Sequence, residues 1–167
     1  MPPTWTTRPN GCCGGLERKG LRLATAESCT GGLIASLVTD IEGLSSTFER
    51  GFVTYTDEAK CDLLGIEPLE IARHGVVSRE IALAMAEGAL ARSNAHLALG
   101  VTGFAGKAGP HDEAGLVHLA VVRHGARPIL RECHFGQANR DMVRTRVAEA
   151  ALEMLGEMLA ETMAEQR

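Results

Sequence analysis

Aromatic side chains are scarce in this chain, making up 4% of its 167 residues, with one Trp and one Tyr. Proteins that bind single-stranded nucleic acid stack bases on aromatic rings, so this scarcity disfavours such a role. Basic residues are not in excess either, since 17 Lys and Arg stand against 21 Asp and Glu and the net charge is -4. That charge provides no general attraction for phosphate backbones or anionic lipid. We therefore expect neither nucleic acid nor a membrane as a partner.

Long apolar runs are also missing from the chain. No stretch approaches the roughly 18 apolar residues that span a bilayer. Residues 1–10 lack the apolar segment of a secretory signal peptide. These two absences predict a cytoplasmic protein.

Cysteine and histidine spacings typical of metal sites are absent. The five Cys are an odd number, with no CxxC pair, and the six His show no HxxxH spacing. Zinc sites and disulfide frameworks depend on such patterns. We expect no metal and no cofactor, and free thiols at Cys12, Cys13, Cys29, Cys61 and Cys133.

The length of 167 residues favours one domain. Residues 1–15 are rich in Pro and Gly and are expected to form a loose leader without helix or strand, before a single domain over 16–167. Apolar patterns predict five strands, at 21–26, 51–56, 96–101, 115–123 and 128–134. Apolar residues at helical spacing predict helices over residues 33–41, 57–64, 78–90 and 139–165. This alternation predicts a three-layer α/β/α sandwich with a mixed, roughly five-stranded sheet, its last two strands forming a hairpin.

Three polar, Gly-rich turns follow predicted strands, at residues 27–32, 56–60 and 102–109. Ligands of open α/β sheets bind beyond the carboxyl ends of the strands. Side chains in these turns are therefore the candidates for catalysis and substrate binding.

Ser28 lies where a strand turns into a helix, and the N–H groups of Thr30, Gly31 and Gly32 are expected to be unpaired there. Such a turn can stabilise an oxyanion or bind phosphate. Ser28 is therefore a candidate nucleophile, with a purely structural N-cap hydroxyl as the alternative. Cys29 competes for the role, because a thiolate at a helix N-terminus has a lowered pKa.

Lys60 is the candidate base. A lysine desolvated among neutral groups can lose its proton near neutral pH and activate a serine, whereas a solvated helix lysine is the alternative. Tyr55 could donate to a substrate or hold the lysine, or be half-buried packing. Thr102 could relay a proton and Gly103 could let a flat ring approach, with ordinary turn residues as the alternative.

Arg140 and Arg144 lie four residues apart, and therefore on one face, near the start of the last predicted helix. Two guanidinium groups so placed could clamp a phosphate. A solvated face, with Asp141 and Glu149 among the arginines, is the alternative.

Four motifs together resemble the CinA C-terminal-domain family over roughly residues 16–159. They are Ala26-Glu27-Ser28-Cys29-Thr30-Gly31-Gly32, the segment FERGFVTYTDEAK at 48–60, His74-Gly75-Val76-Val77-Ser78, and Thr102-Gly103-Phe104-Ala105-Gly106. The combination is specific, whereas each motif alone is weak.

The resemblance implies a metal-independent serine amidohydrolase that removes ammonia from the carboxamide of nicotinamide mononucleotide (NMN), a reaction of pyridine-nucleotide salvage. Ser28 matches the family's nucleophile and Lys60 its base, and Tyr55 and Thr102 match positions expected near that pair. The implied fold is an α/β/α sandwich. A small-molecule nucleotide is the implied partner, and assembly with further copies of the chain is compatible with it.

The chain departs from the family pattern after Gly106. Members usually carry Gly-x-Ala-Gly-Pro, whereas here Lys107, Ala108 and Gly109 precede Pro110. The shifted proline predicts a different loop over 103–113. Two alternatives therefore stand beside NMN hydrolysis: an amidase for another carboxamide, and a catalytically silent nucleotide-binding or interaction module.

Overall fold

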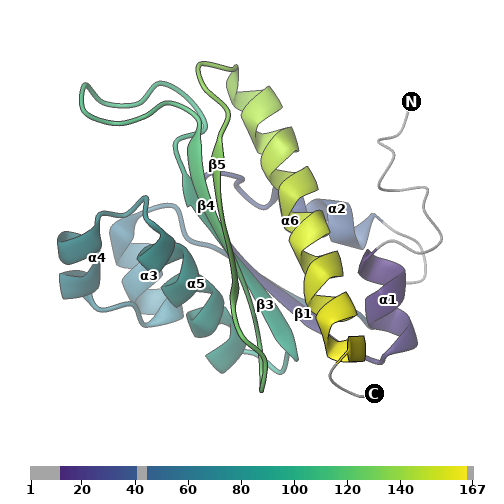
Figure 1. Cartoon of the computed structure of the whole chain (residues 1–167). Coiled ribbons are helices and arrows are strands. Elements are labelled where there is room, and N and C mark those ends of the chain that lie inside the picture. The colour runs from purple at the N-terminus through teal and green to yellow at the C-terminus, as the bar shows by residue number, and fades with distance from the viewer. Residues whose placement is uncertain (1–11, 41–44, 165–167) are drawn as a thin grey trace.

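A computed structural model describes residues 12–40 and 45–164 of the chain. The elements (Figure 1) are, in chain order, α1(Cys12–Arg18), β1(Leu23–Glu27), α2(Leu33–Thr39), β2(Phe48–Val53), α3(Asp57–Leu64), α4(Pro68–His74), α5(Arg79–Ala91), β3(Leu97–Gly103), β4(Leu116–Arg123), β5(Ile129–His134) and α6(Arg140–Ala164). Among the helices of these ranges, none combines the length and the apolar composition needed to cross a membrane.

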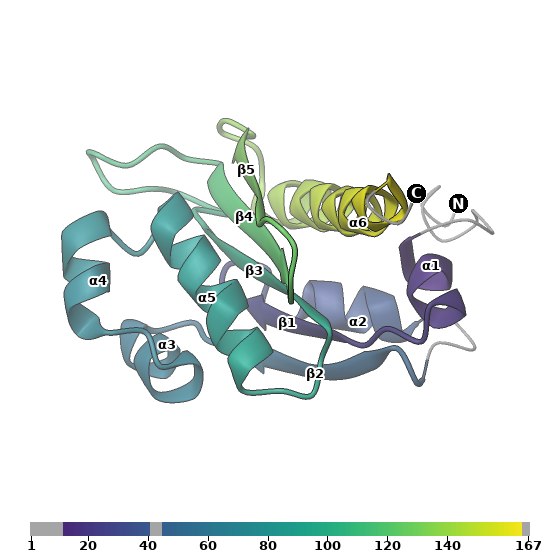
Figure 2. The ribbon, with the colours of Figure 1, turned by 60° about the horizontal axis from the view of Figure 1, so that its bottom comes forward.

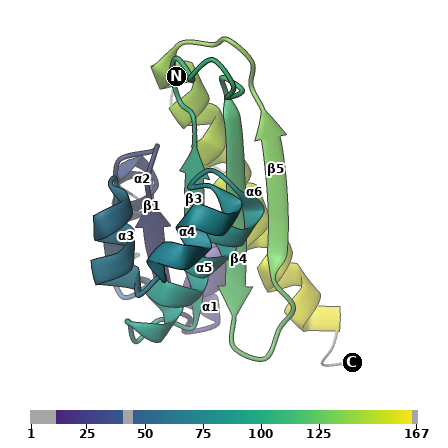
Figure 3. The ribbon, with the colours of Figure 1, turned by 90° about the vertical axis from the view of Figure 1, so that its left-hand side faces the viewer.

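The strands form one mixed sheet in the order β2-β1-β3-β4-β5. β1 runs parallel to β2 and β3, while β4 is antiparallel to both β3 and β5. Helices α3, α4 and α5 cover one face of the sheet, and α1, α2 and α6 cover the other (Figures 2 and 3). The predicted α/β/α sandwich with its mixed five-stranded sheet and final hairpin is confirmed.

Small residues on one face of the central strands bring α5 close to the sheet. Ala24, Ala26 and Ala98 face this helix and are fully buried. A Cβ on Gly100 would overlap the main chain of Ala82 and Ala86. Larger side chains, such as Leu23, Leu97 and Leu99, point to the other face and pack under α6. Both faces of β1 and β3 are thus tightly packed. The two parallel strands end at the same edge of the sheet (Figure 3).

The N-terminal part of the chain differs from its prediction. Residues 12–15 were expected to be without helix, but they form the start of α1. Gly15 allows close packing, because a Cβ there would lie 3.2 Å from Leu159 Cδ1 on α6, and Leu16 is fully buried. Tertiary packing thus overrides a composition that disfavours helix. Residues 1–11 lie outside the described ranges.

Two further elements differ from the sequence pattern. Helix α4 was not predicted, because its seven residues are too few to establish a helical period. Strand β2 begins at Phe48 and ends at Val53, three residues before the predicted end at 56. The early end leaves Thr54 and Tyr55 in a connection whose carbonyl groups contribute to the candidate site.

Candidate active site

The turn after β1 brings Ser28 to the carboxyl ends of two parallel strands. The Ser28 N–H donates to Val101 O on β3 at 3.1 Å, and Gly31 N–H donates to Ser28 O at 3.1 Å. Gly31 and Gly32 adopt φ values of 60° and 93°, a left-handed conformation that would strain other residues. The two glycines therefore allow the sharp turn that leaves the Ser28 side chain 8% exposed at the sheet edge.

Lys60 meets Ser28 from helix α3 and is only 1% exposed. Thr56 begins this helix by accepting the Ala59 N–H at 3.1 Å. The Lys60 Nζ lies 3.3 Å from Ser28 Oγ, 3.0 Å from Thr54 O and 3.4 Å from Tyr55 O. The predicted proximity of serine and lysine is confirmed, and the solvated-lysine alternative is wrong.

Burial favours the neutral form of Lys60, and its hydrogen-bond partners are compatible with that form. Burial lowers the pKa of Lys60, and the charge of Asp57 opposes this shift. The two carbonyl oxygens can only accept hydrogen bonds, whereas a hydroxyl can also donate. When the two N–H groups of a neutral amine bond to Thr54 O and Tyr55 O, the nitrogen lone pair is left for the Ser28 hydroxyl. This geometry is suited to a base that takes the serine proton.

Tyr55 holds the lysine through its main chain rather than through its ring. Its carbonyl accepts from Lys60, while its side chain is 63% exposed. Half-buried packing is therefore wrong for this residue. The exposed phenol is left free for contact with a bound molecule.

The expected set of unpaired N–H groups is wrong for two of its three members. Gly31 N–H donates to Ser28 O, and Gly32 N–H donates to Glu27 Oε2 at 3.2 Å. The Glu27 carboxylate thereby occupies the start of α2, where sequence reasoning placed a phosphate. Within the described ranges, Thr30 N–H donates to no oxygen, so it is the remaining candidate donor for an oxyanion.

Cys29 is poorly suited to act as the nucleophile. Burial raises the pKa of the Cys29 thiol to about 11, and the charge of Glu27 adds to this shift. The expected lowering at a helix N-terminus is wrong, because the carboxylate of Glu27 already neutralises that terminus. The thiol stays protonated near neutral pH, and a protonated thiol is a weak nucleophile.

Thr102 and Gly103 have structural roles that the sequence did not indicate. Thr102 is 1% exposed and its Oγ1 donates to Val76 O at 2.8 Å, which ties the segment before α5 to the end of β3. Its proton is therefore engaged with a carbonyl rather than free for relay. A Cβ on Gly103 would lie 2.6 Å from Val117 Cγ2 and 2.8 Å from Leu116 O. The neighbouring strand therefore requires glycine at this position.

Replacing Gly103 by alanine should destabilise the fold, because the new methyl would collide with the main chain of β4. Overpacking of this kind costs about 1–3 kcal/mol. Urea denaturation measures the change in the free energy of unfolding. Gly109→Ala is the matched control, since its Cβ would meet only the exposed Asp112 carboxylate, and its effect should stay within about 0.5 kcal/mol. Equal stability of the two variants would contradict this account of Gly103.

The two arginines of α6 do not form one clamp. Arg144 donates from Nε and Nη2 to Thr30 O at 3.1 and 2.7 Å, so its guanidinium fixes the serine turn. Arg140 is exposed and lies over Gly106, where a Cβ would be 2.7 Å from its Nη2. The paired-clamp prediction is wrong for Arg144, and Arg140 lies instead beside the turn that follows β3.

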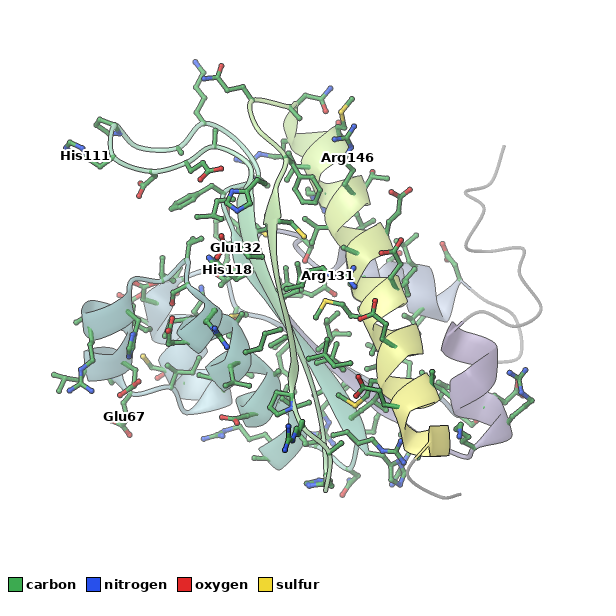
Figure 4. All side chains as sticks on the ribbon, viewed as in Figure 1. Glu67, His111, His118, Arg131, Glu132 and Arg146 are labelled. Carbon is green, nitrogen blue, oxygen red and sulfur yellow. The ribbon has the colours of Figure 1, made fainter. Side chains whose placement is uncertain are left out.

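A second cluster of titratable residues lies at the base of the loop 104–115. His118 is 6% exposed, its Nδ1 is 3.6 Å from Glu132 Oε2, and burial lowers the pKa of His118. Figure 4 shows these two side chains close together, with His111 at the outer end of the loop. Within the described ranges, no group of three or more His, Cys, Asp or Glu is placed to hold a metal ion. Cys29, Cys61 and Cys133 are free thiols.

Sequence reasoning missed Glu27 and the Arg144 contact with the serine turn. The position of Glu27, at the end of a buried strand and before a Gly-rich turn, was a usable signal for a helix-capping carboxylate. No local signal links Arg144 to Thr30, because 114 residues separate them.

The sequence of this chain is similar to those of known proteins. The CinA C-terminal domain matches residues 9–159. The nicotinamide-nucleotide amidohydrolase PncC of Escherichia coli K12 is 42% identical over 143 residues, which cover 84% of this chain and 86% of that protein. A putative competence-damage inducible protein of Symbiobacterium thermophilum is 45% identical over 149 residues, 84% of this chain but 35% of its own length.

Among solved structures, the competence/damage inducible protein CihA of Agrobacterium tumefaciens superposes with a TM-score of 0.82 at 42% identity, covering 89% of this chain and 95% of the other. The chain spans about a third of the longer CinA-like relatives it matches. It spans most of E. coli PncC. The chain belongs to the CinA C-terminal domain family.

Proposed function

We propose that this protein is an amidohydrolase that converts NMN and water to nicotinic acid mononucleotide and ammonia. The observation that carries the proposal is the buried Lys60 Nζ at 3.3 Å from Ser28 Oγ. The 42% identity to E. coli PncC, a nicotinamide-nucleotide amidohydrolase by name, supports the choice of substrate.

In the proposed reaction, Ser28 Oγ attacks the carboxamide carbon while its proton passes to neutral Lys60. Thr30 N–H is the candidate donor to the oxyanion. The charged Lys60 then protonates the amide nitrogen, the C–N bond breaks and ammonia leaves an ester on Ser28. Water attacks the ester, gives a proton to Lys60, and the acid product leaves as the Ser28 hydroxyl is restored.

Arg140 is the proposed contact for the substrate phosphate. It lies over Gly106, its charge acts on Cys29 beside Ser28, and no bond from it to the serine turn is seen within the described ranges. Because the start of α2 is filled by Glu27, an anionic phosphate has to bind away from it. Tyr55, with its exposed ring, lies at the same edge of the sheet.

Release of ammonia separates this proposal from its alternatives. The purified protein is incubated with NMN, nicotinamide riboside, nicotinamide and NAD, and ammonia and product mass are followed. We expect turnover of NMN and weaker turnover of the riboside, which lacks the phosphate. Hydrolysis of a different carboxamide alone would indicate another substrate. NMN binding by calorimetry without ammonia release would indicate a silent binding module.

The rate should rise with pH, because only neutral Lys60 can accept the Ser28 proton. Burial lowers the pKa of Lys60, so the rise should be centred below the ordinary lysine value of about 10.4. The fold disfavours charged Lys60, so the free energy of unfolding should also increase with pH between the folded and unfolded pKa values. Profiles of kcat/KM and of urea denaturation against pH measure both effects. Lys60→Met should remove the rise of the free energy of unfolding with pH. A wild-type rate that falls as the pH rises would contradict the role of Lys60 as the base.

A further inference from the structure

The carboxylate of Glu27 is fully buried beneath the turn that carries Ser28. Its Oε2 accepts the N–H groups of Gly32 at 3.2 Å and Ile34 at 3.0 Å, and its Oε1 accepts that of Ala35 at 2.8 Å. The N-cap position of α2 is Gly32, which has no side chain to cap the helix. The last residue of β1 therefore supplies the cap that the helix itself lacks.

The main chain of Glu27 reaches the other half of the candidate pair. Its carbonyl accepts the Thr54 N–H at 2.9 Å, and the Thr54 carbonyl accepts from Lys60 Nζ at 3.0 Å. One residue thus connects the serine turn, through its side chain, and the lysine, through its backbone. Within the described ranges, Glu27 itself makes no hydrogen bond to Ser28 Oγ or to Lys60 Nζ.

The geometry points to Glu27 as a positioning residue that holds Ser28 Oγ in line with Lys60 Nζ. This inference rests on the proposed Ser28 and Lys60 roles but not on the identity of the substrate. Three N–H groups converge on the side chain, and only a carboxylate can accept from all of them with both oxygens. The amide of glutamine has the same shape, but its nitrogen donates, so it would face N–H groups without an acceptor. The start of α2 would then shift, and Ser28 with it.

The test measures the nucleophilicity of Ser28 with a fluorophosphonate reagent. Ser28 Oγ bonds to phosphorus, fluoride leaves, and the hydroxyl proton passes to Lys60. Intact-protein mass spectrometry gives the maximal labelling rate and the reagent concentration at half that rate. For Glu27→Gln we expect the maximal rate to fall about 100-fold, the loss that a misplacement of about 1 Å produces, with the half-saturating concentration unchanged.

Val121→Ala is the matched control for general loss of stability. Val121 is fully buried on β4, pairs with Leu99 and Ile129, and lies away from the turn. Its variant should melt at a lower temperature and label at the wild-type rate. If the labelling rate of both Glu27→Gln and Val121→Ala fell in proportion to the fall in melting temperature, the role of Glu27 would be structural only.

Glu27→Asp serves as the second variant in case the glutamine form does not fold. Aspartate keeps the charge but is one methylene shorter, so it cannot reach all three N–H groups, and its labelling rate should fall between those of the wild type and Glu27→Gln. A wild-type rate in either folded variant would overturn the positioning role. Labelling of wild-type Ser28 without NMN hydrolysis would overturn only the proposed substrate, whereas no labelling of the wild type would overturn both proposals.

Discussion

Ser28→Ala should reduce kcat by at least roughly 10⁴-fold, the scale of loss when the nucleophile of a serine hydrolase is removed. The residual rate would come from binding and from the oxyanion donor alone. Folding should be unaffected, because the hydroxyl lies at the sheet edge and its N–H and carbonyl bonds belong to the main chain. Ammonia release from NMN measures kcat, and circular dichroism confirms the fold.

Two substitutions near Ser28 sharpen this test. Ser36→Ala changes an exposed serine on α2, eight residues further along, and should keep the wild-type rate. Cys29→Ala should retain most of the activity, because the thiol is protonated near neutral pH. If Cys29→Ala instead lost all turnover while Ser28→Ala kept it, the nucleophile would be the thiol.

Lys60→Arg should lose activity nearly as fully as Lys60→Ala, each by about 10³-fold or more. A guanidinium keeps its charge at every accessible pH and cannot accept the Ser28 proton. A lysine that only attracted an anion would be replaced in part by arginine. The measurement is kcat for both variants across pH, with thermal melts to confirm that the larger side chain is tolerated at a site only 1% exposed.

Small amines extend this test. Lys60→Ala leaves space for a primary alkylamine next to Ser28, and a neutral amine there should restore part of the rate. The rescued rate should depend on the basicity of the amine, as expected for proton transfer. Lys19→Arg, an exposed change outside the site, is the control. Substantial activity in Lys60→Arg, or a rescued rate that does not depend on amine basicity, would mean that another group accepts the Ser28 proton.

The layers of the fold could be predicted because each depends on local patterns. Alternating strands and helices indicated the sandwich, and a tight turn between two apolar runs indicated the β4–β5 hairpin. Helix α1 could not be predicted in this way. Its glycines disfavour helix locally, and the element exists because Gly15 and Leu16 pack against and beneath neighbouring structure.

In the candidate site, too, some features could be predicted from local sequence and others depend on the whole fold. Ser28 and Lys60 were identifiable from their motifs, although 32 residues separate them. The partners that define their chemistry are main-chain atoms, namely the Thr54 and Tyr55 carbonyls, and a carbonyl carries no side-chain signature. The pKa of Cys29 was predicted in the wrong direction for a related reason. Helix position alone suggests a thiolate, and the burial that reverses the shift is a property of the whole fold.

The turn that carries Ser28 is synthesised early, but the guanidinium that holds its Thr30 carbonyl comes from Arg144, 114 residues later. Helix α6 is the last described element to be synthesised, and it covers one face of the sheet together with α1 and α2 (Figure 1). A nascent chain halted before α6 therefore contains Ser28, Lys60 and the Glu27 contacts but lacks the Arg144 contact that fixes the serine turn. During translation, the turn that carries Ser28 gains its full set of contacts only after α6 has been synthesised.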